Sequence, residues 1–298
     1  MAVRAVVEFA VRMGGALGGL HGGDVRLGVC WLTILQANIE QAQGDGPLGD
    51  DGRRPITVHA LSQVLRNSPE TTRRHVNALV ARGLVARGPA GVIVPLAAQA
   101  SAEGRACEQA ILSAFRQLLE SLDRIGFDLG PLKAPDGRID IAAGHASLLP
   151  AISGFFLRIT LEAKPVYDND IITGLVFSAM MAANVGWMAD NPTLSWSFAD
   201  ADKPPPDDLR QPAAIVIIAR MTQMPFTTVQ RHISRLETLG FCAKVGRGYI
   251  TTTARMTDPV MVARGAIVVD SLNKMISQLG RAGFRWRSQP AETAAVAS

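Results

Sequence analysis

Apolar residues recur at helical spacing along much of this chain of 298 residues. Between residues 24 and 42 one buried helical face is made of Val25, Val29, Leu32, Leu35 or Gln36, and Ile39. The stretch ITVHALSQVL predicts a short helix over residues 56–65. A third helix is predicted directly afterwards, because Ser68 can cap its first turn, Pro69 suits the first helical position and Gly83 can end it.

The stretch LVARGPAGVIVP, residues 84–95, alternates apolar residues on both sides of a Gly-Pro turn, which predicts a β-hairpin. A longer helix follows, with a buried face of Ile111, Phe115, Leu118, Leu122 and Ile125. The expected fold class is therefore mainly α, with small β-hairpins.

The same order of residues occurs twice along the chain. A shift of 146 positions places Phe9 on Phe155 and Asn38 on Asn184. From residue 53 onward the shift is 157, and it aligns RRHVNALVARG with QRHISRLETLG. The larger shift predicts one insertion in the second copy, within residues 188–212, whose Pro run and acidic residues favour a surface loop.

We therefore predict two units, residues 1–144 and 145–298, each with a central motif between flanking helices. The motifs span 53–95 and 210–252, and the flanking helices lie within 3–43 and 99–127, and within 148–190 and 258–284. The outer helices have apolar faces that a single unit could not bury. We expect those helices to form the contact between the units: 3–13, 106–126, 148–162 and 261–284.

The stretch SPETTRRHVNALVARGLVAR, from Ser68 to Arg87, resembles the turn and second helix of bacterial winged helix-turn-helix regulators of the MarR, ArsR and GntR kinds. The stretch TTVQRHISRLETLGFCAKVGRGYIT resembles them too, down to the Gly-Arg-Gly at the tip of the wing. The resemblance implies two tandem winged helix-turn-helix units in a pseudo-two-fold arrangement, with double-stranded DNA as the partner. Such proteins bind as two-fold dimers with one helix in each successive major groove. Fused units would give one chain the geometry of a dimer.

A helical wheel separates an inner from an outer face in both motifs. Thr72, Val76 and Leu79 should pack inward, as should Val229, Ile233 and Leu236. The outer faces and the wings bear side chains that can reach bases or phosphates, and the alternative for them is a solvated surface. The candidate DNA-binding residues are Ser68, Thr71, Arg73, Arg74, Asn77 and Arg87 in the first unit, and Thr228, Gln230, Arg231, Ser234, Lys244 and Arg247 in the second.

Basic charge is concentrated in the two motifs. The net charge of the chain is +4. Residues 53–95 contribute +6 and residues 210–252 contribute +5, so the rest of the chain is −7. This distribution places positive charge where a phosphate backbone would lie. His75 and His232 repeat as well, but they flank the buried stripe, so a structural hydrogen-bonding role is expected for them.

Catalytic, cofactor and metal-binding motifs are not apparent in the sequence, and we expect no enzymatic activity. Cys30, Cys107 and Cys242 have no C-x-x-C spacing, which argues against a disulfide framework and favours a reducing compartment. Two of them should fill core positions, and Cys242 should lie on a strand. Glu8 and Arg12 interrupt the N-terminal apolar run, and no spanning helix is proposed, so a cytoplasmic location is expected.

The sequence favours a DNA-binding transcriptional regulator over two alternatives. One is a plasmid-type replication or partition initiator, whose sites would lie near an origin. The other is an interaction module that has lost DNA binding, favoured in the second unit by Met224 in place of the Ser68 cap. A further hypothesis is a small-molecule effector that binds in a cavity between the halves. The residues that could line this cavity are Trp31, Phe155, Phe156, Met180 and Trp187. The alternative is that they are ordinary core residues. Whether the chain dimerises further stays open.

Overall fold

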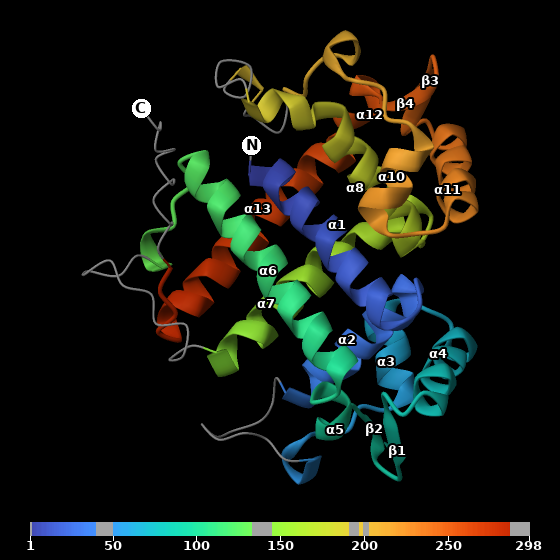
Figure 1. Ribbon diagram of the computed structural model, residues 1–298, viewed down its shortest axis with the longest axis vertical. Coiled ribbons are helices and arrows are strands. Elements are labelled where there is room, and N and C mark those ends of the chain that lie inside the picture. The colour runs from blue at the N-terminus through green and yellow to red at the C-terminus, as the bar shows by residue number, and fades with distance from the viewer. Residues whose placement is uncertain (1, 40–49, 133–144, 191–196, 199–202, 287–298) are drawn as a thin grey trace, which may run out of the picture.

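The computed structural model describes residues 2–39, 50–132, 145–190, 197–198 and 203–286. The described chain is mainly helical and has two antiparallel two-stranded sheets, which confirms the predicted fold class at this level (Figure 1). The first half consists of α1 (Ala2–Leu20), α2 (Val25–Ile39), η1 (Asp50–Gly52), α3 (Val58–Leu65), α4 (Pro69–Ala81), β1 (Ala86–Gly88), β2 (Gly91–Ile93), α5 (Leu96–Gln99), α6 (Ala102–Arg124) and η2 (Gly130–Leu132).

The second half has nearly the same order of elements. It consists of α7 (His145–Ala163), η3 (Lys164–Tyr167), α8 (Ile171–Val185), η4 (Gly186–Asp190), η5 (Asp207–Leu209), α10 (Ile215–Thr222), α11 (Phe226–Thr238), β3 (Cys242–Val245), β4 (Gly248–Thr251), α12 (Thr253–Met256) and α13 (Pro259–Arg281). The short helices α5 and α12 were not predicted. The predicted insertion lies partly outside the described residues, and its described part includes η5.

Each hairpin forms where the sequence predicts it. In each half, one residue of the segment before α3 or α10 also pairs with the second strand of the hairpin. Ile56 bridges to Val92 in the first half, and Ala213 bridges to Tyr249 in the second. Gly91 has φ +140°, and a Cβ on it would lie 2.5 Å from the carbonyl oxygen of Ile56. Glycine is therefore required there, because the bridging segment passes too close for a side chain.

A buried asparagine ties each hairpin to its flanking helix. Asn38 Nδ2 donates to the carbonyl of Arg54 at 2.7 Å, and its Oδ1 accepts from the Val94 amide at 2.9 Å. Asn184 makes the counterpart contacts, at 2.7 Å to the Gln211 carbonyl and 2.9 Å from the Thr251 amide. Both side chains are fully buried. Their amides satisfy backbone groups that would otherwise be unpaired in the core.

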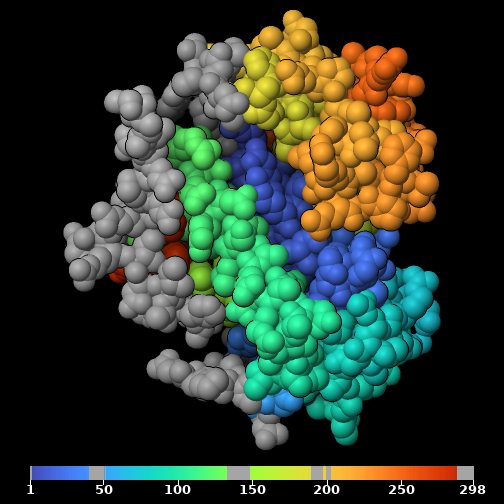
Figure 2. Space-filling view, viewed as in Figure 1, coloured from blue at the N-terminus to red at the C-terminus, as the bar shows by residue number. Residues whose placement is uncertain are grey.

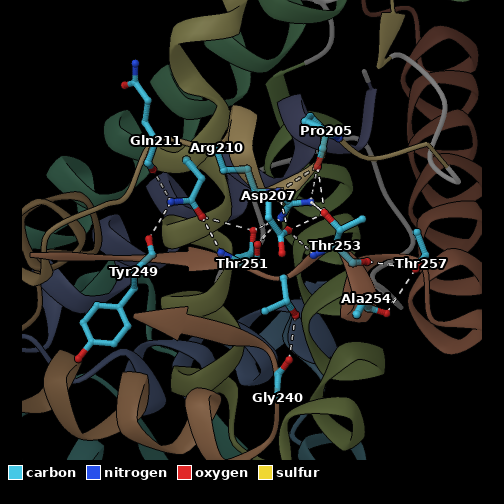
Figure 3. A network of polar contacts seen from close by, with 12 residues as sticks. Pro205, Asp207, Arg210, Gln211, Gly240, Tyr249, Thr251, Thr253, Ala254 and Thr257 are labelled. Carbon is cyan, nitrogen blue, oxygen red and sulfur yellow. Dashed lines mark hydrogen bonds and ion pairs between the residues drawn. The ribbon is translucent and has the colours of Figure 1, made fainter. Parts of the chain in front are cut away.

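A buried arginine lies three residues before the bridging residue of each half. Arg53 and Arg210 are only 6% and 5% exposed. The guanidinium of Arg210 donates to the carbonyls of Pro205 and Thr251, and its Nε lies 3.8 Å from Asp207 (Figure 3). These two arginines therefore hold the fold together, and counting them as charge available to phosphates was wrong. Without them the net charge of the two motifs falls from +11 to +9.

The two halves share one apolar core. The ring centroids of Phe9 and Phe155 are 5.7 Å apart, at the contact of α1 with α7. Helix α1 also packs on α8 and α10, and α2 packs on α7. The prediction that the outer helices form the contact is confirmed for α1 and α7. Helices α6 and α13 also reach the other half, because α6 packs on α7 and α13 packs on α1 and η2, and the ring centroids of Phe115 and Phe284 are 6.1 Å apart. The prediction overlooked α2 and α8.

Polar contacts also cross between the halves. Arg26 of α2 pairs with Asp170, the N-cap of α8, at 2.9 Å. The buried ammonium of Lys164 donates to the carbonyls of Leu65 and Arg66 at 2.7 and 2.8 Å. It thereby satisfies carbonyls at the end of α3 that have no partner within that helix. Polar pairing as well as apolar packing thus sets how the halves are placed.

One helical stretch, Ile171–Met188, is long and apolar enough to cross a membrane, and its 18 residues contain no charge. Thr, Ser and Asn side chains interrupt its apolar run, so the expectation of no spanning helix missed this stretch. In the structure 72% of this stretch is buried inside the protein, as in the core helix of a globular fold. Within the part of the chain that the structure describes, no other helix meets the same criteria.

The three cysteines are buried and unpaired. Cys30 and Cys107 fill core positions and Cys242 lies on β3, as predicted. Burial raises the pKa of each thiol to about 12, so all three are protonated at neutral pH.

We expect Asn184→Ala to lower the free energy of unfolding by about 2–4 kcal/mol, because it leaves the Thr251 amide buried without a partner and removes the hydrogen bonds to the Gln211 and Tyr249 carbonyls. Asn38→Ala should have a similar effect. Chemical denaturation would measure both, with Gln230→Ala on an exposed helical surface as the control, expected within about 0.5 kcal/mol of wild type. Losses no larger than that of the control would contradict the role given to the asparagines.

Candidate nucleic-acid interface

Helix α4 is built as the sequence predicts. The Ser68 hydroxyl accepts a hydrogen bond from the Thr71 amide at 3.1 Å and donates to the Thr71 hydroxyl at 2.9 Å. The inward residues Thr72, Val76 and Leu79 are completely buried. Because Ser68 and Thr71 hydrogen-bond to each other, they stabilise the first turn of the helix. They lie at the edge of its outer face.

The outer face of α4 is exposed and meets its hairpin. Arg73 pairs with Glu70 at 2.6 Å. Arg87, on β1 of the hairpin, donates to the side-chain carbonyl of Asn77 at 2.9 Å. Among the residues that the structure describes, no carboxylate forms an ion pair with Arg74. Helix and hairpin therefore form one continuous polar surface, with the Arg74 guanidinium turned to solvent.

Helix α11 starts differently from α4. Pro225 is its N-cap and makes no side-chain hydrogen bond. The expectation that Met224 stands in place of Ser68 was therefore wrong by one position, and Met224 is a core residue, 6% exposed. Phe226, the first residue of the helix, is 49% exposed. The start of this helix is thus apolar where that of α4 is polar.

The outer face of α11 also points to solvent. Gln230, Arg231 and Ser234 are exposed, and Thr228 is half-buried at the edge. Lys244 and Arg247 are exposed on the hairpin of β3 and β4. In the described segments Arg231 has no carboxylate partner, whereas the neighbouring Arg235 pairs with Asp168 and lies 3.6 Å from Asp170. Arg235 is therefore engaged in holding α11 on the N-terminus of α8.

Helices α4 and α11 lie on the same side of the molecule, with their hairpins at opposite ends (Figure 1). Figure 2 shows the two lobes in teal and orange along that side, with blue N-terminal residues between them. All twelve candidate residues are exposed or half-buried. The candidate residues therefore form two separate surfaces, one in each half, on the same side of the molecule.

Two histidines lie behind these surfaces, as expected from their place on the wheel. His75 and His232 are 8% and 3% exposed. His232 Nδ1 is 2.9 Å from the Thr173 hydroxyl and 3.3 Å from the Asp170 carboxylate. Burial is the largest influence on both rings and lowers the pKa of each, against the nearby carboxylates of Asp24 and Asp170. They are therefore structural residues behind the outer faces.

The residues suggested for a cavity between the halves do not form one. Phe155, Phe156 and Met180 are buried in the shared core. Trp31 borders only a very small cavity, and a larger one lies between α1, α7, α8 and α13. No known protein family, curated protein or solved structure matches the chain.

We expect the free energy of unfolding to fall by on the order of 1 kcal/mol for each of these histidines as the pH drops from neutrality to about 5. The unfolded chain takes up protons below about pH 6.5 that the folded chain, with its lowered histidine pKa values, does not. Urea denaturation across this range should give a flatter pH profile for His232→Gln. A wild-type stability that does not fall toward pH 5 would exclude this effect.

Proposed function

We propose that the chain is a DNA-binding transcriptional regulator in which two winged helix-turn-helix units are joined. The observation that supports it most is the repeated set of α3, α4 and β1–β2, and of α10, α11 and β3–β4, with both outer faces on one side of the molecule. In this proposal α4 and α11 are the recognition helices and the hairpins are the wings.

The chemistry of the outer faces suits a nucleic-acid duplex. Arg74 and Arg231 occupy counterpart positions, are exposed and are available for bidentate contact with guanine or a phosphate. Asn77 and Gln230 can pair with adenine, and Arg87, Lys244 and Arg247 extend the positive charge along the wings. The net charge of +9 that remains in the two motifs supports electrostatic attraction to a phosphate backbone.

The shared core gives the two recognition helices a fixed spacing within one chain. A conventional dimer obtains this spacing by association of two identical subunits. Here the two outer faces differ in chemistry, since Arg73 and Asn77 stand against Gln230 and Ser234. We therefore propose an imperfect palindrome as the binding site, with half-sites that favour different bases.

A second candidate function, protein binding by the second half, is favoured by exposed apolar side chains around α11. Phe226, Val216 and Val245 are 49%, 61% and 42% exposed, on α11, α10 and the hairpin. Exposed aromatic and aliphatic groups are more typical of contacts with proteins than of contacts with phosphates. In this alternative the first half alone would bind DNA.

Binding of selected DNA by Arg74→Ala and Arg231→Ala separates these functions. If both helices contact bases, each substitution should cost about 1–3 kcal/mol and relax specificity at one half-site. Fluorescence anisotropy at several salt concentrations would measure this, and log K against log salt should have a slope of about −5 if about six phosphates are neutralised. Arg116→Ala, which removes an exposed charge from α6, is the control and should have little effect.

The pattern of losses identifies the function. Losses in both variants support DNA contact by both halves, whereas a loss in Arg74→Ala alone supports a protein-binding second half. Wild-type affinity in both variants, or a binding constant that does not respond to salt, would rule out the proposed DNA interface.

A further inference from the structure

Two cavities occupy the same place in the two halves. The larger has a volume of about 220 Å³ and lies between α1, α7, α8 and α13. The smaller, of about 10 Å³, lies between α2, α6 and the start of α7. All nine residues that line the smaller cavity have counterparts, at the shifts of 146 and 157, among the residues that line the larger one. The same site is therefore closed in the first half and open in the second.

Side-chain size accounts for much of the difference. Leu32 in the closed site corresponds to Ser178 in the open site, and Glu108 corresponds to Gly265. Both changes remove side-chain atoms from the lining. Two changes run the other way, from Gly104 to Met261 and from Cys107 to Arg264. Methionine is a flexible side chain that adapts readily to a bound molecule.

The charge of the site changes together with its size. Cys107 of the closed site corresponds to Arg264 of the open one, while Glu108 gives way to Gly265. The open site has thus gained a cation and lost a carboxylate. Arg264 donates to the carbonyl of Ile159 at 3.1 Å. Across the described ranges no carboxylate forms an ion pair with it, so its guanidinium can still take an anionic partner.

An empty space of this size would weaken the core, because its lining residues lack contacts on one side. The first half shows that the fold can fill the same place with side chains. Apolar cavities with a small number of polar groups at one point are typical of sites for small organic molecules. The other cations of the lining, Arg4, Lys164 and Arg210, each have a partner in the protein already. Most of the remaining lining is apolar.

We propose that the second-half cavity binds one small, largely apolar organic carboxylate, with the carboxylate on Arg264 and the apolar body against α1 and α8. The site is a property of the chain by itself and does not depend on the proposed DNA binding. The first half has no equivalent site, so the stoichiometry is one ligand for each chain.

Calorimetric titration of the full chain tests this with 2-naphthoate and octanoate as probes and 2-naphthamide as the uncharged analogue. We expect one site for each chain and at least tenfold tighter binding of 2-naphthoate than of its amide. Arg264→Gln should weaken 2-naphthoate about tenfold or more and leave the amide unchanged. Ser178→Leu, which installs the residue of the closed site, should weaken both.

Lys274→Gln is the matched control, since it removes an exposed cation elsewhere on α13. It should bind 2-naphthoate like the wild type. The proposal is overturned if neither acid binds at millimolar concentration, or if two equal sites are found for each chain. It is also overturned if 2-naphthoate and its amide bind equally well, or if Lys274→Gln weakens 2-naphthoate as much as Arg264→Gln does. If Arg264→Gln does not fold, unchanged binding in Ser178→Leu overturns it.

Discussion

The shared core between the two halves is the constraint on which the rest of the structure depends. Phe9 stacks on Phe155, and the long helices α1 and α7 each pack both within their own half and across to the other. Lys164 and Arg26 add polar contacts between the halves beside this core. Because these helices serve both halves, α4 and α11 cannot change their spacing without disturbing the core. The fixed spacing is what the proposed recognition of two grooves requires.

The sequence predicted those features that depend on local pattern. Helical periodicity placed Val76 and Ile233 inside, and the Gly-Pro turn located the first hairpin. The sequence could not predict Arg53 and Arg210 as buried, because arginine is usually exposed and these side chains find their partners only in the folded chain, Arg53 at Gln99 and Arg210 at the Pro205 and Thr251 carbonyls. The roles of α2 and α8 at the contact between halves, and of Lys164 across it, also arise from packing between distant segments. The sequence does align Arg53 with Arg210 at the shift of 157, three residues before the bridging residues of the two halves, and this recurrence is the signal for a shared structural role.

The two halves share a framework and differ in what they present. Asn38 and Asn184 make the same contacts, so the hairpins are held in the same way. By contrast, the Ser68 side chain caps α4, whereas the proline at the start of α11 makes no side-chain hydrogen bond. The cavity of the second half is also nearly filled by side chains at the same place in the first half. Residues that hold the fold are thus kept in both copies, and residues at surfaces and cavities diverge. This division is what would be expected if each half had taken a distinct part in binding.

The most direct test of the account is the number of chains that occupy one binding site. Footprinting of a selected DNA site, with the mass of the complex measured by light scattering, gives this number. The account predicts one chain protecting two unlike half-sites whose centres lie about 10 base pairs apart, one turn of the duplex. Two chains on a perfectly symmetric site, each using only α4 or only α11, would contradict it.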